Sequence, residues 1–247
     1  MKKSLVMALS LALGSTVVFA GPPAAHKGGI EEKGYVWNAQ EGEKIEALKL
    51  KGDEKAGKEA YMVCSACHLP NGAGLPDGTF PQLAGQHATV IIKQIADIRE
   101  GLRNNPIMHP FAMALSDAQD LADVSAYIQT LCIPRGHGMG SKDPAILTHG
   151  EGLYKKECTS CHGANGEGDK AKFYPVIAGQ HYKYMLRQVT KFRHGKRCNA
   201  NPDMVKIVKK YSDRDLDAVV TYMSTLTMPG TLCPEKPLAD PSFQISR

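Results

Sequence analysis

The chain has 247 residues, seven cysteines and a formal net charge of +5 at pH 7. Once an N-terminal export signal is removed, about 227 residues remain, which is enough for one large or two small domains. The expected export from the cytoplasm argues against nucleic acid as a partner.

Residues 1–20 have the features of a secretory signal peptide. Lys2 and Lys3 precede an apolar stretch over residues 5–19, and the small residue Ala20 stands at the expected cleavage site. The apolar stretch is shorter than the ~20 residues of a membrane-spanning helix, and no later segment comes closer. We therefore expect a periplasmic protein with no membrane span after cleavage, rather than one held by an uncleaved anchor.

An internal repeat follows an N-terminal extension over residues 21–52. Cys-x-x-Cys-His stands at 64–68 and again at 158–162, and Pro-x-x-Ala-Gly-Gln-His at 81–87 returns at 175–181 with the same offset of 94 residues. Two copies of this size indicate two tandem domains rather than a solenoid. The expected division is domain 1 at 53–132, a linker at 133–147, domain 2 at 148–233 and a tail at 234–247.

Each copy predicts three helices and no strand, so the expected fold class is all-α. The first copy places them at 54–63, between His87 and Gly101, and from Ser116 onward, where Ser116 and Gln119 resemble an N-terminal capping box. The second copy repeats them from Thr148, before Gly195 and from Ser212. Apolar residues recur at helical spacing in each of the two longer helices.

The glycine-rich segment 134–141 is expected to be a flexible, solvated part of the linker. His137 and Met139 lie in it, and we expect them to be solvated rather than to bind a metal.

The two Cys-x-x-Cys-His units predict covalent attachment of two c-type haems. Cys64 and Cys67, like Cys158 and Cys161, stand about one turn apart and can add to the two vinyl groups of one porphyrin. His68 and His162 follow directly and are the expected proximal iron ligands. A zinc site would need further ligands and a thioredoxin-like pair a βαβ context, and neither is evident.

Methionines are the expected sixth ligands, because a thioether favours ferrous iron and closes the iron to other ligands. Met108 and Met204 each lie eight residues before a predicted helix start, whereas Met113 has no counterpart and is expected to pack in the core. The carbonyls of Pro81 and Pro175 are candidate acceptors for the proximal histidines.

This order of motifs resembles that of class I cytochromes c, in which Cys-x-x-Cys-His precedes Pro-x-Leu-x-Gly and a distal methionine. Shown twice over about 180 residues, with Ile177 replacing the second leucine, it is most similar to dihaem cytochromes of the c4 type. The resemblance implies a periplasmic electron carrier with one haem per domain. It assigns Cys64, Cys67, His68 and Met108 to the first haem, and Cys158, Cys161, His162 and Met204 to the second.

Several residues lie outside the shared pattern. Of Cys132, Cys198 and Cys233, at most one pair can form a disulfide within a monomer, and Cys198–Cys233 is the first expectation. Trp37 either belongs to a surface arm or covers a haem edge or propionate. His87 and His181 are expected to form hydrogen bonds near the domain interface or the haem periphery, rather than to bind iron.

The leading hypothesis is a respiratory electron carrier, not an enzyme, that meets redox partners. The alternatives are a dihaem enzyme such as a thiosulfate dehydrogenase or peroxidase, for which Cys198 is the supporting feature, and a subunit of a larger oxidoreductase. Charge is uneven: residues 54–132 balance to −3 and residues 148–232 to +6. An acidic partner is therefore expected to dock on the second domain.

Overall fold

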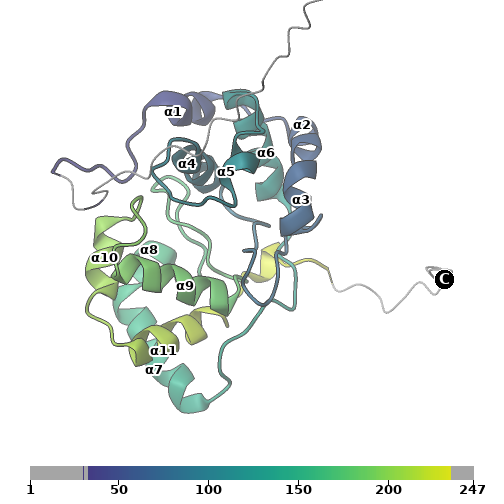
Figure 1. Ribbon diagram of the computed structural model, residues 1–247. Helices are drawn as coiled ribbons and strands as arrows, with labels where there is room; N and C mark the ends of the chain where they lie inside the picture. Colours follow the sequence, from purple (N-terminus) through teal and green to yellow (C-terminus); the bar gives the residue numbers. More distant parts are fainter. Residues whose placement is uncertain (1–29, 31–32, 235–247) are drawn as a thin grey trace, which may run out of the picture.

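The computed structural model describes residue 30 and residues 33–234, and the predicted signal peptide and most of the tail lie outside this part (Figure 1). The first half of the described chain contains six helices: α1 (Gly42–Lys49), α2 (Glu54–Ala60), α3 (Met62–His68), α4 (Ala88–Arg99), α5 (His109–Ala112) and α6 (Ala118–Thr130). The second half contains α7 (Pro144–Glu157), α8 (Thr159–His162), α9 (Tyr182–Arg193), α10 (Pro202–Val208), α11 (Asp213–Met223) and the short 3-10 helix η2 (Pro229–Thr231).

The all-α prediction is confirmed, since the described residues form only isolated β-bridges, Ile133 with Leu232 and Asp169 with Tyr174. No helix in the described part of the chain combines the length and apolar character needed to cross a membrane.

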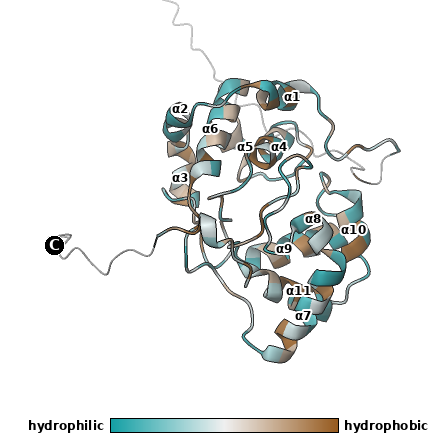
Figure 2. Ribbon diagram, turned by 180° about the vertical axis from the view of Figure 1, so that it is seen from behind, coloured by the Kyte–Doolittle hydropathy of each residue, from teal (hydrophilic) through white to brown (hydrophobic). Residues whose placement is uncertain are grey.

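Each half encloses its own core. Residues such as Ile91, Leu121 and Val124 fill the first, and Tyr154, Leu216 and Val220 fill the second. Figure 2 shows hydrophobic and hydrophilic residues interspersed along the helices, as expected when each helix buries only one side. In both halves the helix before the Cys-x-x-Cys-His motif packs on the last long helix, α2 on α6 and α7 on α11.

Glycine allows the two helices of each pair to approach one another closely. A Cβ atom on Gly57 would lie 2.0 Å from the carbonyl oxygen of Asp123, and one on Gly150 would lie 2.0 Å from that of Ala218. Any larger side chain would push the paired helices apart.

Two predicted helix starts are displaced. Helix α6 is capped by Asp117, whose carboxylate accepts from the backbone N–H groups of Gln119 and Asp120, so the predicted capping box at Ser116 is wrong. Helix α7 begins at Pro144, ahead of the predicted Thr148, because Asp143 caps it and proline suits the first helical position. Helix α11 starts at the predicted Ser212, which forms a capping box with Asp215.

The expected flexible linker is instead packed. His137 Nε2 lies 2.7 Å from the carbonyl oxygen of Ser224, and Gly138 donates its N–H to His181 Nδ1 at 3.0 Å. His137 is therefore half-buried and hydrogen-bonded, and its ring ties the connection to the second half. Met139, by contrast, is 48% exposed, as expected.

The expected Cys198–Cys233 disulfide is wrong. Cys233 is bonded to Cys132, and Cys198 is a free thiol. Cys233 reaches Cys132 because the last residues pair with the end of the first half: Ile133 donates to Thr231 O at 2.8 Å, and Cys233 donates to Ile133 O at 2.9 Å.

The described part of the N-terminal extension is packed against both halves and is not a loose surface arm. Helix α1 lies on α4 and α6, as Figure 1 shows. The Tyr35 hydroxyl donates to the carbonyl oxygen of Ala200, and the half-buried Trp37 ring stacks on Tyr174 at a centroid distance of 6.3 Å.

Candidate haem-binding sites

The first Cys-x-x-Cys-His motif occupies α3. His68, at its end, is only 3% exposed, and its Nδ1 lies 2.9 Å from the carbonyl oxygen of Pro81, as predicted. Its Nε2 is buried and has no hydrogen-bond partner. Burial lowers the pKa of His68, which favours a neutral ring with its proton on Nδ1 and a free lone pair on Nε2. This is the state in which imidazole binds a metal.

The second motif places His162, which is half-buried, at the end of α8 and in the same relation to a proline carbonyl. His162 Nδ1 lies 3.3 Å from the carbonyl oxygen of Pro175, the position equivalent to Pro81. Burial also lowers the pKa of His162. Both predicted histidine–proline contacts are therefore present.

The glycines that follow each motif close the loop between histidine and proline. Gly74 donates its N–H to His68 O, and Gly168 donates to His162 O, at 2.9 and 3.0 Å. Both have positive φ angles, and a Cβ atom on either would lie 2.4 Å from the carbonyl oxygen of Phe80 or Tyr174. Glycine is required here because the loop must bring the proline carbonyl back to the histidine ring.

The four motif cysteines are free thiols of intermediate exposure. Burial raises the pKa of Cys64 to about 11 and that of Cys158 to about 12. A zinc site or a reactive redox pair needs thiolates, which these surroundings disfavour. Among the described residues, no three His, Cys, Asp or Glu side chains converge as a metal site. This donor set fits a haem attached by thioether bonds.

The candidate sixth ligands lie at helix starts. Met108 precedes α5 and is half-buried, while Met204 lies in the first turn of α10 and packs against the second core. Met113, expected in the core, is 51% exposed, so that expectation is wrong. Met113 lies at the C-terminal end of α5, and it is Leu115 that belongs to the core of the first half.

The two halves meet through equivalent residues. Gln86 exchanges two hydrogen bonds with the backbone of Val176, and Gln180 does the same with the backbone of Gln82. The adjacent histidines also form hydrogen bonds between the two halves. His87 Nε2 lies 2.8 Å from Glu167 O, and His181 Nε2 lies 2.8 Å from Ala73 O. The expected interfacial role of His87 and His181 is confirmed.

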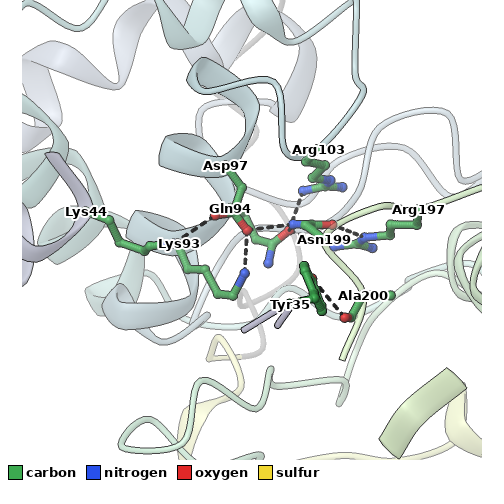
Figure 3. A network of polar contacts seen from close by, with 9 residues as sticks. All are labelled: Tyr35, Lys44, Lys93, Gln94, Asp97, Arg103, Arg197, Asn199 and Ala200. Carbon is green, nitrogen blue, oxygen red and sulfur yellow. Dashed lines mark hydrogen bonds and ion pairs between the residues drawn. The ribbon is translucent and has the colours of Figure 1, made fainter. Parts of the chain in front are cut away.

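A buried polar network between the halves was not foreseen (Figure 3). Asp97 accepts from Lys44, Lys93 and Asn199, and all four side chains are less than 5% exposed. Next to it, Gln94 accepts from Arg103, Arg197 and Asn199. Arg103 and Arg197 end a repeated Gly-x-Arg segment, Gly101-Leu-Arg and Gly195-Lys-Arg. The sequence does not show that they are buried, because charged side chains normally lie on the solvated surface.

Cations outnumber carboxylates in this network. Lys44, Lys93, Arg103 and Arg197 are drawn in Figure 3 with Asp97, and Glu100 is a second carboxylate that interacts with Lys44, so the cations are still in excess. Burial lowers the pKa of Lys93 to about 8, and burial together with Arg103 lowers that of Arg197 to about 9. After burial, the charge of Arg103 also contributes to the lowered pKa of His68, so the network acts electrostatically on the first site. Such an excess calls for an anionic group.

Comparison with known proteins supports this description. The family description "Cytochrome c" matches residues 54–132 and 147–227. Cytochrome c4 of Azotobacter vinelandii is 35% identical over 194 residues, covering 71% of this chain and 90% of that protein. A "thiosulfate dehydrogenase electron acceptor" of Stutzerimonas stutzeri is 34% identical over 175 residues, covering 68% of this chain and 80% of that protein. The crystal structure of reduced cytochrome c4 from Pseudomonas stutzeri superposes with a TM-score of 0.61 at 32% identity, covering 71% of this chain and 99% of that one.

Proposed function

The chain belongs to the cytochrome c family as a dihaem electron-transfer member with two covalently attached haems c, and from this premise we propose how its residues serve that role. Cys64 and Cys67 hold the first haem, and Cys158 and Cys161 hold the second. When bound, each haem supplies an iron that accepts and returns one electron.

His68 and His162 are the proposed proximal ligands. The observation that carries this assignment is the buried, unpartnered Nε2 of His68, whose Nδ1 is directed at the Pro81 carbonyl. That acceptor orients the ring and strengthens Nε2 as a donor. Met108 and Met204 are the proposed sixth ligands, which would close both irons to exogenous ligands.

The buried cations have a role in the same proposal. Haem propionates are carboxylates, and Arg103, Arg197 and Lys93 would hold them where the network of Figure 3 has too little negative charge. Tyr35 and Trp37 from the N-terminal extension would then shield this region, since the Trp37 ring contacts both Tyr174 and the Lys93 ammonium.

We place the mature protein in the periplasm, after cleavage at Ala20, as a carrier of a respiratory chain. It would have no substrate site of its own. Two relatives bear the name thiosulfate dehydrogenase electron acceptor, so an enzyme of that kind is one candidate electron donor. The competing interpretation, that this chain is itself such an enzyme, rests on the free thiol of Cys198.

Substitution of Cys198 separates the two functions. Cys198→Ser should leave both haem spectra and the rate of electron exchange unchanged, because a carrier with histidine and methionine ligands does not use this thiol. A changed Soret band in the Cys198→Ser protein would favour the enzyme.

An acidic partner should exchange electrons through the second half, where Lys209 and Lys210 are exposed directly after the helix that bears Met204. Lys209→Glu combined with Lys210→Glu should slow reduction by an acidic redox protein and flatten its dependence on ionic strength, without changing either potential. Stopped-flow rates measured over a salt series provide the test. Equal rates for the wild type and the double variant at low ionic strength would exclude this surface.

A further inference from the structure

Helix α9 carries an open basic groove on its outer side. The groove has a volume of about 380 Å³ and is formed by the helix and the turn that follows it. Its lining residues are Lys183, Leu186, Arg187, Thr190, Lys191, His194 and Lys196. They include four permanent cations and one histidine and no carboxylate, so the groove suits a negatively charged occupant.

The equivalent surface of the first half is already covered. Helices α4 and α9 each begin after the repeated histidine, so Ile92, Ala96 and Asp97 on α4 correspond to Leu186, Thr190 and Lys191 on α9. Ile92 and Ala96 are buried in one cluster with Ala47 of α1, and Asp97 is paired with Lys44 of α1 at 3.1 Å. Helix α1 is therefore the cover of this surface in the first half.

The second half has no such cover among the described residues. There α9 packs against α10 and α11, and the first half reaches it only near its start, where Arg187 donates to the Gly78 carbonyl at 2.6 Å. Lys183, Lys191 and Lys196 are exposed. Leu186 preserves the apolar contact point that Ile92 provides to α1. The charge at the neighbouring position is inverted, because Lys191 stands where α4 has Asp97. An occupant shaped like α1 would need a carboxylate in place of the Lys44 ammonium.

We propose that the α9 groove docks an acidic amphipathic helix of a partner protein, in the manner in which α1 docks on α4. The occupant would place an apolar side chain against Leu186 and a carboxylate against Lys191, with further acidic groups near Lys183 and Lys196. The groove contains none of the proposed haem ligands. It would hold a partner in place, whereas the surface around Lys209 and Lys210 would exchange electrons, so the two proposals can fail separately.

A peptide derived from α1 provides the probe. It comprises residues 40–51 with Lys44→Glu, carries a fluorophore, and is stapled into a helix because an isolated peptide of this length is only marginally helical. Fluorescence anisotropy should show saturable binding to the holoprotein at low ionic strength, weakened by added salt. Lys191→Glu should raise the Kd at least tenfold, whereas the matched double variant Lys209→Glu with Lys210→Glu should bind as the wild type does.

A charge exchange makes the test specific. The stapled peptide with the natural Lys44 should bind the wild type weakly and the Lys191→Asp protein more tightly. The reason is that this variant offers the peptide's lysine a carboxylate at the position equivalent to Asp97. Haem content and circular dichroism verify that each variant is folded.

The proposal is overturned if no saturable binding is seen, if both peptides bind equally well, or if the Lys209/Lys210 variant loses as much affinity as Lys191→Glu. Binding of a DNA duplex as tight as that of the peptide, or self-association of the chain that Lys191→Glu abolishes, would assign the groove to another occupant and also overturn it.

Discussion

The two nitrogen atoms of the His68 ring have different surroundings, and this difference defines the site. Nδ1 faces the Pro81 carbonyl at 2.9 Å, while Nε2 is buried without a partner. A buried polar atom left without a hydrogen bond costs about 1–3 kcal/mol, which a bond from Nε2 to iron would offset. The repeat places His162 and Pro175 in the same relation.

Methionine ligation is testable at single residues. In Met108→Ala the first iron should lose its sixth ligand, bind carbon monoxide when reduced and shift to a lower potential, because the thioether stabilises ferrous iron. Met204→Ala should do the same to the second haem. Absorption spectra with and without carbon monoxide, and a redox titration, measure both effects.

Met113→Ala is the matched control, because Met113 is 51% exposed and belongs to the same helical turn region as Met108. Its spectra should equal those of the wild type. Loss of half of the methionine-dependent absorption in this variant would show that Met113, and not Met108, binds the iron.

At the scale of single helices, short-range sequence patterns predicted the helix ends that depend on local contacts. Gly101 and Gly195 follow the ends of α4 and α9 as expected, and α11 starts after Ser212, its predicted beginning. The start of α6 was wrong by one residue, because Ser116 and Asp117 are both good caps and only the folded backbone shows which side chain reaches the free N–H groups. Helix α1 was missed altogether, since its buried Lys44 depends on Asp97, a residue distant in sequence.

The corrected cap of α6 leads to a prediction about stability. Asp117→Ala should lower the free energy of unfolding by about 1 kcal/mol, because two backbone N–H groups lose their acceptor. Ser116→Ala should change it by less than about 0.5 kcal/mol, as for most surface substitutions. Denaturant unfolding of the holoprotein compares the two, and an equal loss in both variants would contradict this assignment of the cap.

At the scale of the whole molecule, the sequence repeat predicted two domains of one kind but not how they are joined. The Gln86 and Gln180 contacts are backbone-directed and form only once the halves meet. The pairing of Cys132 with Cys233, 101 residues apart, likewise follows from the return of the last residues to the first half. Segment 134–141 has a flexible composition, yet packing against Ser224 and His181 orders it.

Removing the disulfide should therefore loosen the whole molecule. Cys132→Ser combined with Cys233→Ser should lower the free energy of unfolding by about 2–5 kcal/mol, since the crosslink closes a long loop of the unfolded chain. Cys198→Ser should have little effect by comparison. Thermal unfolding with and without a thiol reductant tests this, and a wild type that is insensitive to reduction, although its disulfide is shown to open, would contradict it.

The central claim is that each half holds one haem between a histidine and a methionine. The most direct measurement is an optical redox titration of the purified protein, with haem content determined per chain and the weak far-red band of iron–methionine bonding recorded in the oxidised state. Two haems per chain, two one-electron steps and a far-red band of the strength expected for two methionine-ligated irons are predicted. A single haem, or a far-red band of half that strength or less, would contradict the account.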